Sequence, residues 1–471
     1  MTVLIAGAGP TGLTLGIELA RRGIPCRIFE RAQRLFLGSR GKGLQPRTLE
    51  VFDDLGVLDA IRAGGMPFPK FRLYSGTEIV WERPLHEMLG IEETRPSPSV
   101  PYPQPWLIPQ WRTDEILHDR FVQLGGKVEF DSEVIGVEQD DDEVRITVRR
   151  NGIDEVITGD YLVGTDGGRS TVRKLLGVGF EGETYETEQT LVGDVRVDGL
   201  TGTACHILTH SGDVMKRFSL WNLPGSDHYQ LVATVTDAAI PTLANVQQLL
   251  ADRTGRTDIR LHDLRWISVY RINVRMVDRF RVGRVLLAGD AAHVHSSASG
   301  QGLNTSVQDA YNLGWKLAGV IGGAPDELLD SYEAERMPVA AQVLGLSSAM
   351  HARNFRPTTG SAPAIHQLDI TYRGGPLAKD DRATPGELRA GDRAPDGLLP
   401  DGTRLFDLFR GPHFTHLTFD RPAEGYDVEP GTHVLVRPDG YIAVISPETD
   451  AVEQWLARFG TAPVRRMQPV A

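Results

Sequence analysis

The apolar positions near the N-terminus form two short unbroken runs separated by a helical pattern. Residues 3–6 are all apolar, as expected for a strand that is buried on both faces. Apolar residues then recur at helical spacing across residues 13–20, and Gly23 ends that pattern. A second strand pattern covers residues 26–30. This order predicts a strand–helix–strand unit at the start of the chain.

The pattern beyond this unit alternates between regular and irregular segments. Helices are predicted at residues 47–63, 114–124, 304–321 and 327–352. Strands are predicted at residues 134–137, 144–148, 161–164, 285–288, 416–419 and 433–436. Prolines cluster in the segment 67–110, which predicts an irregular, extended conformation there. Short alternating strands over residues 192–274 predict an antiparallel sheet inserted into the chain.

A glycine-rich turn lies between the first strand and the first helix, where a dinucleotide site would need it. In Gly7-x-Gly9-x-x-Gly12, the first glycine allows a tight turn, the second lets a pyrophosphate approach the backbone, and the third allows close packing. The helix N-terminus offers free N–H groups to phosphate. Glu30 ends the second strand, where a carboxylate can accept from ribose hydroxyls. The predicted dinucleotide-binding residues are Gly7, Gly9, Pro10, Thr11, Gly12, Glu30 and Arg31.

Two further Gly/Asp stretches follow later strands. Gly164-Thr165-Asp166-Gly167-Gly168-Arg169 alone could be an ordinary turn, and Gly289-Asp290-Ala291-Ala292-His293 alone could be a helix cap. No second Gly-x-Gly-x-x-Gly occurs in the chain. A nicotinamide reductant would therefore bind transiently, without a Rossmann domain of its own, or would not be used at all.

All three stretches together, with their flanks, closely resemble the signatures of the group A flavoprotein monooxygenases, the aromatic hydroxylases of p-hydroxybenzoate hydroxylase type. The likeness includes Gly300-Gln301-Gly302-Leu303-Asn304 and the run from Asp309 to Leu317, and it extends to Tyr332-Glu333-Ala334-Glu335-Arg336. It is strongest to the larger members that hydroxylate polyketides, antibiotics and phenols. The resemblance implies that the dinucleotide is FAD.

The resemblance also implies roles for individual residues. Asp290 would lie near the ribityl chain, and the backbone of Gly300, Gly302, Leu303 and Asn304 would lie near the flavin ring at a helix N-terminus. Arg40 and Gln45 match the loop beside the pyrophosphate and the mobile isoalloxazine. Arg112 matches a side chain that reaches the ribityl or phosphate region. Asp166 and Arg173 match a segment that serves both FAD and NAD(P)H.

The implied fold is α/β and has three parts. A discontinuous Rossmann-like FAD-binding domain would comprise residues 1–72, 111–191 and 276–355. A mixed or antiparallel β-sheet domain for the substrate would comprise residues 73–110 and 192–275. A linker (356–390) would lead to a thioredoxin-like domain (391–471), which lacks Cys-x-x-Cys and so would have a structural or dimer-forming role.

The implied reaction is hydroxylation of an aromatic, phenolic or polyketide-like natural product. NADPH or NADH would reduce the flavin, and O2 would then add to give a C4a-hydroperoxide that transfers oxygen. One segment departs from the family pattern: Ser297 stands where many hydroxylases have Pro, and Ser299 replaces a Gly. Loss of a proline loosens this loop. An alternative is therefore an FAD-bound tailoring enzyme that catalyses a non-redox cyclisation, and a third is a flavin-binding protein without catalysis.

Composition narrows the setting. A chain of 471 residues predicts two or three domains. A net charge of −12 argues against nucleic-acid binding, and no apolar run reaches the roughly 18–20 residues of a membrane span. Cys26 and Cys205 are the only cysteines, which suits a reducing cytoplasm. We expect a cytoplasmic monomer or homodimer whose partners are a small aromatic substrate and O2.

The sequence does not single out a catalytic residue. His293 and His295 lack a third ligand, so we expect no metal site. His206, His210, His228 and Tyr270 are candidates for holding or deprotonating a phenol.

Overall fold

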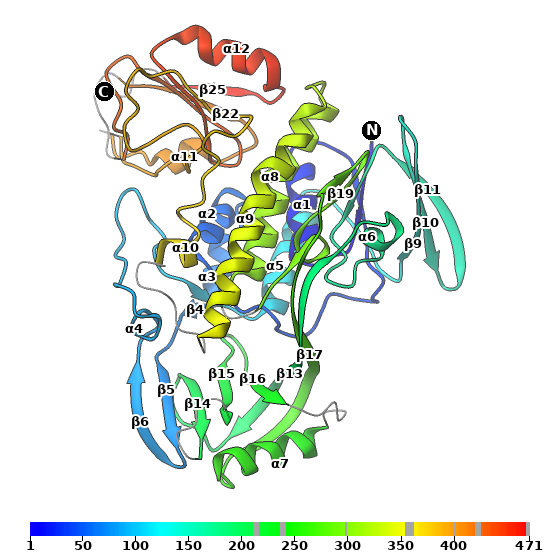
Figure 1. The fold of residues 1–471 in the computed structure, drawn as a ribbon, viewed down its shortest axis with the longest axis vertical. Coiled ribbons are helices and arrows are strands. Elements are labelled where there is room, and N and C mark those ends of the chain that lie inside the picture. The colour runs from blue at the N-terminus through cyan, green and yellow to red at the C-terminus, as the bar shows by residue number, and fades with distance from the viewer. Residues whose placement is uncertain are drawn as a thin grey trace.

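The computed structural model describes residues 1–210, 216–235, 242–296, 299–353, 362–399, 401–419 and 425–467. Three parts follow one another along the long axis of the molecule (Figure 1). A mixed α/β part lies in the middle, a large sheet lies at one end, and a smaller sheet with the C-terminal helix lies at the other. No described helix is long and apolar enough to cross a membrane.

The middle part is built on a six-stranded sheet with the order β18-β19-β12-β1-β2-β8. Its strands are β1 (Val3–Ala6), β2 (Cys26–Phe29), β8 (Val128–Glu129), β12 (Tyr161–Gly164), β18 (Arg281–Val282) and β19 (Val285–Leu287). β1 pairs in parallel with both β2 and β12, and only the edge strand β18 is antiparallel to its neighbour. The predicted strand–helix–strand unit and the α/β class are confirmed.

The helices of the middle part are α1 (Pro10–Ala20), α2 (Pro46–Asp54), α3 (Leu58–Gly64), α5 (Gln110–Gln123), α6 (Thr171–Leu175), α8 (Gly302–Ile321) and α9 (Glu327–Ala352). Small residues let α1 approach its neighbours closely. A Cβ on Gly16 would lie 2.8 Å from Ile28, and one on Gly314 would lie 2.5 Å from the Cβ of Glu18. Glycines thus hold α1 between the sheet and α8.

Two predictions about this half of the chain were wrong in detail. Residues 47–63 form two helices because Gly56 turns the chain with a φ of +72°. The segment 67–110 is not wholly irregular, since β5 (Phe71–Ser75) and β6 (Glu78–Arg83) form a hairpin. The prolines that suggested irregularity cluster after residue 95, beyond that hairpin.

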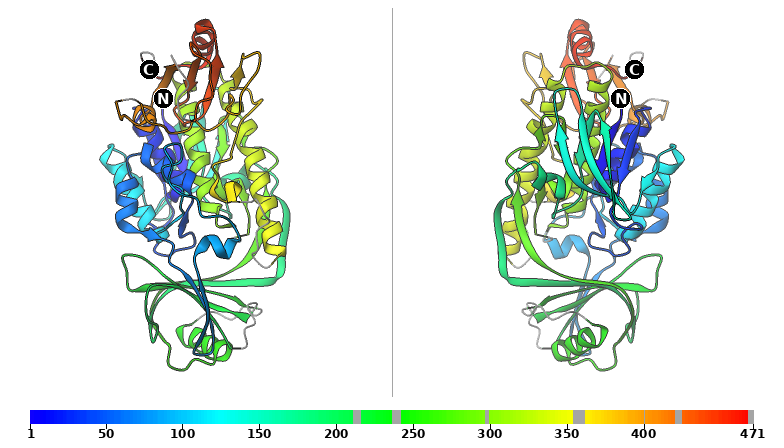
Figure 2. Two further views of the ribbon diagram at one scale, coloured as in Figure 1. Left: turned by 90° about the vertical axis from the view of Figure 1, so that its left-hand side faces the viewer. Right: turned by 90° about the vertical axis from the view of Figure 1, so that its right-hand side faces the viewer.

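The large sheet has eight strands in the order β20-β17-β13-β16-β15-β14-β5-β6. Besides β5 and β6 it contains β13 (Glu181–Asp198), β14 (Cys205–Thr209), β15 (Phe218–Asn222), β16 (His228–Val235), β17 (Arg260–Met276) and β20 (His293–Val294). The long strands β13 and β17 connect it to the middle part, and α7 (Leu243–Thr254) covers the face that points away from that part (Figure 2). Only β14 and β5 pair in parallel.

Smaller sheets complete the middle part. One consists of β9 (Glu133–Gln139), β10 (Val144–Arg150) and β11 (Ile153–Gly159), and the other of β3 (Gly43–Leu44), β4 (Met66–Pro67) and β7 (Trp106–Leu107). The short helix α4 (Leu85–Leu89) follows β6, and α10 (Ala362–His366) follows α9.

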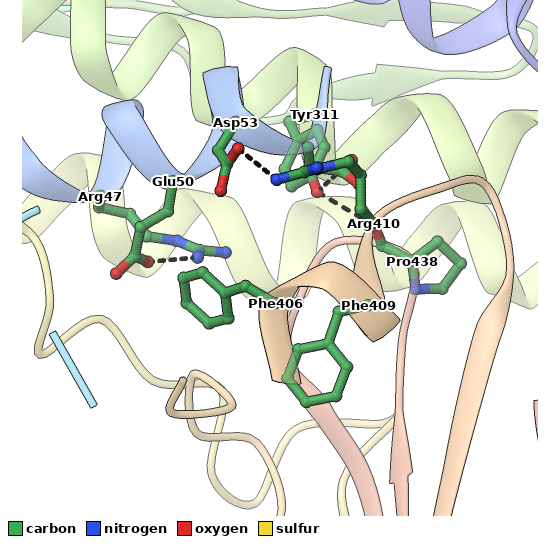
Figure 3. A pocket seen from close by; sticks show the side chains of 10 residues that line it. Arg47, Glu50, Asp53, Tyr311, Phe406, Phe409, Arg410 and Pro438 are labelled. Carbon is green, nitrogen blue, oxygen red and sulfur yellow. Dashed lines mark hydrogen bonds and ion pairs between the residues drawn. The ribbon is translucent and has the colours of Figure 1, made fainter. Parts of the chain in front are cut away.

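The C-terminal part has a five-stranded sheet with the order β21-β24-β23-β22-β25. Its elements are β21 (Lys379–Asp380), α11 (Leu405–Phe409), β22 (Phe414–Thr418), β23 (His433–Val436), β24 (Ile442–Ser446), α12 (Thr449–Phe459) and β25 (Val464–Arg466). An ion pair and a hydrogen bond join it to α2. Arg410 pairs with Asp53 at 2.6 Å (Figure 3), and Arg47, which also pairs with Glu50 within α2, donates to the Asp439 carbonyl at 2.7 Å. The cavity of about 30 Å³ between them is far too small for a dinucleotide.

Candidate functional site

The three glycines of the first turn differ in what a side chain at each position would contact. Gly7 has a φ of +102°, and a Cβ there would lie 2.6 Å from the Thr165 carbonyl oxygen. A Cβ on Gly12 would lie 2.0 Å from the Gly7 oxygen. A Cβ on Gly9 would meet no described atom within 4 Å. The protein's own packing therefore requires Gly7 and Gly12, whereas Gly9 leaves open space at the helix N-terminus, where a pyrophosphate would approach.

The N-terminus of α1 is chemically suited to that pyrophosphate. Among the described residues, no side chain caps the helix, and Pro10 occupies its first turn. The backbone N–H groups that begin the helix, with the positive end of its dipole, are thus available to an anion. Glu30 accepts hydrogen bonds from the Ala8 and Ala32 N–H groups, both at 2.9 Å, which fixes its carboxylate beside the turn. Each of its oxygens keeps a lone pair for a ribose hydroxyl.

The other two Gly/Asp stretches pack directly against this turn. The backbone of Thr165 and Asp166 lies under Gly7, as its close contacts show. Gly289, with a φ of +62°, packs so tightly that a Cβ would lie 2.7 Å from the Thr11 hydroxyl. The three stretches, far apart in sequence, therefore form one cluster at the ends of β1, β12 and β19.

Arg173 fastens the second stretch to the third. Its guanidinium donates to the Ala291 carbonyl at 2.8 Å and to the Gly168 carbonyl at 2.9 Å, and it stacks on the Phe180 ring. The Asp166 carboxylate accepts from the Ser170 hydroxyl and from the first N–H groups of α6. These contacts give both residues a structural role, and their predicted contact with FAD or NAD(P)H stays a prediction.

Asp290 follows Gly289 in the third stretch, beside the cluster. Its side chain keeps some solvent-exposed surface. Desolvation by the surrounding protein atoms raises the pKa of its carboxyl, while the charges of His293 and Arg40 oppose that shift. The turn that presents it is fixed from below by Asp309, which accepts from the Gly289 N–H at 3.1 Å and pairs with His293 at 2.7 Å. A carboxylate that is accessible on a rigid turn fits the predicted acceptor for the ribityl chain.

The N-terminus of α8 faces the same region. Asn304, fully buried, accepts from the Gln45 N–H at 2.7 Å and donates to the carbonyls of Gly43 and Gly300 at 2.9 and 3.0 Å. A Cβ on Gly41 would lie 3.1 Å from Leu303. In the described part of the chain no side chain caps α8, and the buried Gln45 Oε1 has no partner. Free N–H groups and an unpaired amide oxygen suit the polar edge of a flavin ring.

The predicted arginines lie on the open side of this region. Arg40 is exposed and stacks on Phe36 and Trp266, with 5.1 and 5.7 Å to the ring centroids. Arg112 makes one surface pair with Glu115 at 3.1 Å, which is a weak interaction. Arg31 is exposed. All three guanidinium groups remain accessible to a charged ligand.

The serine-rich loop is only partly described. Ser296 is buried, and its carbonyl accepts from the Ser347 hydroxyl at 2.5 Å. Ser299 is buried with an unpaired hydroxyl. Residue 297, the predicted replacement for proline, lies outside the described residues. The His295 Nδ1–H donates to the Ser296 carbonyl at 2.8 Å, and burial lowers the pKa of His295 to about 4. Within the described ranges, no three metal-ligating side chains gather.

The proposed phenol-binding histidines are poorly placed for that role. His206 is completely buried and bonded to the Tyr74 hydroxyl at 2.9 Å, and burial lowers its pKa to about 4. His210 lies at a strand end and packs on Gly255. His228 is half-buried near Asp263, and Tyr270 is half-buried on β17. Sequence reasoning did not single out Lys42 or the completely buried Asp194, although an acid within the apolar strand run Leu-Val-Gly-Asp-Val is a detectable signal.

Comparison with known proteins agrees with this geometry. A family model described as "FAD binding domain" matches residues 1–347. A flavin-dependent monooxygenase of Mycobacteroides abscessus is 63% identical over 474 residues, which cover 97% of this chain and 100% of that protein. The structure of OxyS anhydrotetracycline hydroxylase from Streptomyces rimosus is 32% identical with a TM-score of 0.78, over 98% of this chain and 100% of that one. A ternary complex of aklavinone-11 hydroxylase with FAD and aklavinone is 27% identical with a TM-score of 0.80, over 97% and 98%.

Proposed function

Since this chain belongs to the FAD-dependent aromatic monooxygenases, we propose that it hydroxylates a polyketide-like aromatic compound with NAD(P)H as electron donor and O2 as oxygen source. The observation that carries the proposal is the convergence of the three Gly/Asp stretches beside two uncapped helix N-termini. The three relatives compared above are named as monooxygenases or hydroxylases, which favours oxygen transfer over the alternative of a non-redox cyclisation.

The residues present fit FAD in a definite order along the cluster. Gly9 and the first N–H groups of α1 would bind the pyrophosphate, and Glu30 would bind the adenosine ribose. Asp290 would accept from the ribityl hydroxyls, and the start of α8 would lie against the polar edge of the ring. FAD, when bound, supplies hydride acceptance and the activation of O2. The positive end of the α8 dipole stabilises negative charge at that edge.

The eight-stranded sheet would supply the substrate surface. The face opposite α7 lies against residues 36–43, the segment that also contacts the start of α8. A substrate between this face and the flavin would be enclosed by both parts of the protein, which limits the access of water during oxygen transfer.

A direct assay tests this proposal. Anhydrotetracycline, the substrate named for the relative OxyS, is a reasoned first candidate. We expect it to stimulate NAD(P)H oxidation and O2 uptake by the FAD-loaded protein and to yield a hydroxylated product. Product formation without NAD(P)H would contradict the proposal. A cytoplasmic location and a monomeric or homodimeric state are part of the same proposal, and light scattering of the holoenzyme tests the latter.

A further inference from the structure

One row of side chains crosses the eight-stranded sheet on the face opposite α7. The strand register places Trp266, Asp194, Gln230 and Trp221 side by side on β17, β13, β16 and β15. Residues paired across strands point to the same face. The next residues along three of these strands, Val195, Leu231 and Leu220, belong to the apolar cluster under α7. The row therefore faces the middle part of the molecule.

Residues 36–43 lie along this row. Phe36 packs edge-on against Trp266 with 5.1 Å between ring centroids, and a Cβ on Gly38 would lie 2.4 Å from the same ring. The Gln230 side chain donates to the Ser39 carbonyl and accepts from the Lys42 ammonium. The Gln230 side chain thus connects residues 36–43 to the sheet.

Lys42 lies between the start of α8, where the flavin ring would bind, and the sheet face that would bind the substrate. Its neighbour Gly41 packs on Leu303, and the carbonyl of Gly43 accepts from Asn304, so its backbone is held at the start of α8. Its side chain extends the other way, with the ammonium 3.8 Å from the centroid of the Trp221 ring. The ammonium has three donors, and among the described residues only Gln230 accepts one. Two donors remain at the place where flavin and sheet would meet.

Asp194 supplies the compensating charge. It is completely buried, and neither carboxylate oxygen has a hydrogen bond of good geometry within the described part of the chain. Burial raises its pKa to about 6. The donors of Ser39 and the charges of Arg265 and Lys42, which face it from the loop and from β17, oppose that effect. Burial lowers the pKa of Lys42 to about 8, while Cys205 and Asp194 oppose it.

In a purely structural ion pair, the two charged groups would be in direct contact. Buried pairs in this protein, such as Lys316 with Glu335 at 2.7 Å, lie in direct contact. Lys42 and Asp194 share an environment, but among the described residues neither makes such a contact. Buried charges that are left short of partners are costly. A ligand oxygen that accepts from the Lys42 ammonium would supply the missing partner.

We propose that Lys42 binds the ionised hydroxyl of a phenolic or enolic substrate, and that Asp194 is a positioning residue that keeps the ammonium charged. This assignment rests on the proposed function and names the substrate chemistry of the same site. The substrate O–H bond breaks and its proton leaves to solvent, while the oxygen keeps the electron pair and accepts from the Lys42 ammonium. The ring becomes richer in electrons and more reactive toward an electrophilic oxygen.

The test uses the FAD-loaded protein and two probes, 4-nitrophenol, whose ionised form absorbs visible light, and nitrobenzene, which cannot ionise. Wild type should bind 4-nitrophenol as the phenolate. Lys42→Met should weaken that binding by roughly 10- to 100-fold, the usual effect of losing a charge-assisted hydrogen bond, and should leave nitrobenzene binding unchanged. Lys42→Arg should retain phenolate binding. The matched control is Lys70→Met, which removes a lysine that is 62% exposed.

The pH profile separates positioning from packing. Phenolate binding needs a protonated Lys42, so in wild type it should weaken as the pH rises through about 8. Asp194→Asn removes a charge that favours the ammonium, so this limit should move to lower pH, and Lys42→Arg should move it far higher. Equal phenolate binding by wild type and Lys42→Met, absence of binding by wild type, or an unmoved limit in Asp194→Asn would overturn the assignment. O2 uptake by the wild-type holoenzyme with anhydrotetracycline tests the proposed function separately, because that assay uses neither probe and no variant.

Discussion

Neutralising Glu335 should weaken the contact between the C-terminal part and helices α8 and α9. The Glu335 carboxylate lies on α9 and accepts from Arg437 at 2.6 and 2.9 Å, from Lys316 at 2.7 Å and from Asn312 at 2.8 Å. All four side chains are buried. Glu335→Gln keeps the shape of the side chain but leaves the Lys316 ammonium without an ion-pair partner among the described residues.

The magnitude follows from the pKa of Glu335. Burial alone would raise it, but the charges of Arg437 and Lys316 outweigh burial and hold the pKa at about 2, against an ordinary value of 4.5. At 1.36 kcal/mol per pKa unit this difference corresponds to about 3 kcal/mol. Breaking a buried ion pair typically costs about 3–5 kcal/mol. We therefore expect Glu335→Gln to lower the free energy of unfolding by about 3–5 kcal/mol at neutral pH.

Urea unfolding followed by tryptophan fluorescence measures this effect, since Trp315 lies 5.2 Å from the Arg437 guanidinium. The folded-state pKa is depressed, so the contribution of Glu335 is complete above pH 4.5 and is lost as the pH falls toward 2. The gap between wild type and variant should close over that range. Glu327→Gln, which breaks a surface pair of 66% and 63% exposed side chains, is the control and should change stability by less than about 0.5 kcal/mol. A loss below about 1 kcal/mol for Glu335→Gln, or a gap that does not depend on pH, would refute the reasoning.

Three other substitutions test the site. Gly9→Ala should leave the free energy of unfolding of the apoprotein within about 0.5 kcal/mol of wild type but weaken FAD binding measured by flavin fluorescence, because only the cofactor would meet the new methyl group. Gly12→Ala should lower both stability and FAD affinity, since its Cβ would lie 2.0 Å from the Gly7 oxygen; unchanged melting would contradict this. Asn304→Ala should cost about 1–3 kcal/mol by leaving the Gln45 N–H and two carbonyls unpaired, with a matching loss of retained flavin.

Sequence patterns predicted those elements whose conformation is set by residues adjacent in the chain. The glycine-rich turn, its two strands and the long helix that begins at Gly302 follow from spacing and backbone freedom alone. The division of residues 47–63 at Gly56 was missed because a single glycine in an otherwise helical pattern does not reveal its φ. The β5–β6 hairpin was missed because its support comes from β14, more than a hundred residues away.

The polar network of the site could not be predicted from the sequence, because its partners are distant in the chain. His293 is hydrogen-bonded to the buried Asp309, which pairs with Arg336, and Arg336 reaches the Tyr372 hydroxyl at 3.0 Å. The sequence placed His293 in a motif but gave no sign of its partner. Lys42 and Asp194 were not singled out because they come together only where the loop 36–43 packs on the sheet.

The reaction that we propose for this protein is the transfer of an oxygen atom from O2 to an aromatic substrate. Mass spectrometry of the product formed from anhydrotetracycline under oxygen-18 gas, with FAD and NAD(P)H, tests it most directly. We expect a product that carries one labelled oxygen and forms only when NAD(P)H is present. A product without the label, or one that forms equally well without NAD(P)H, would contradict it.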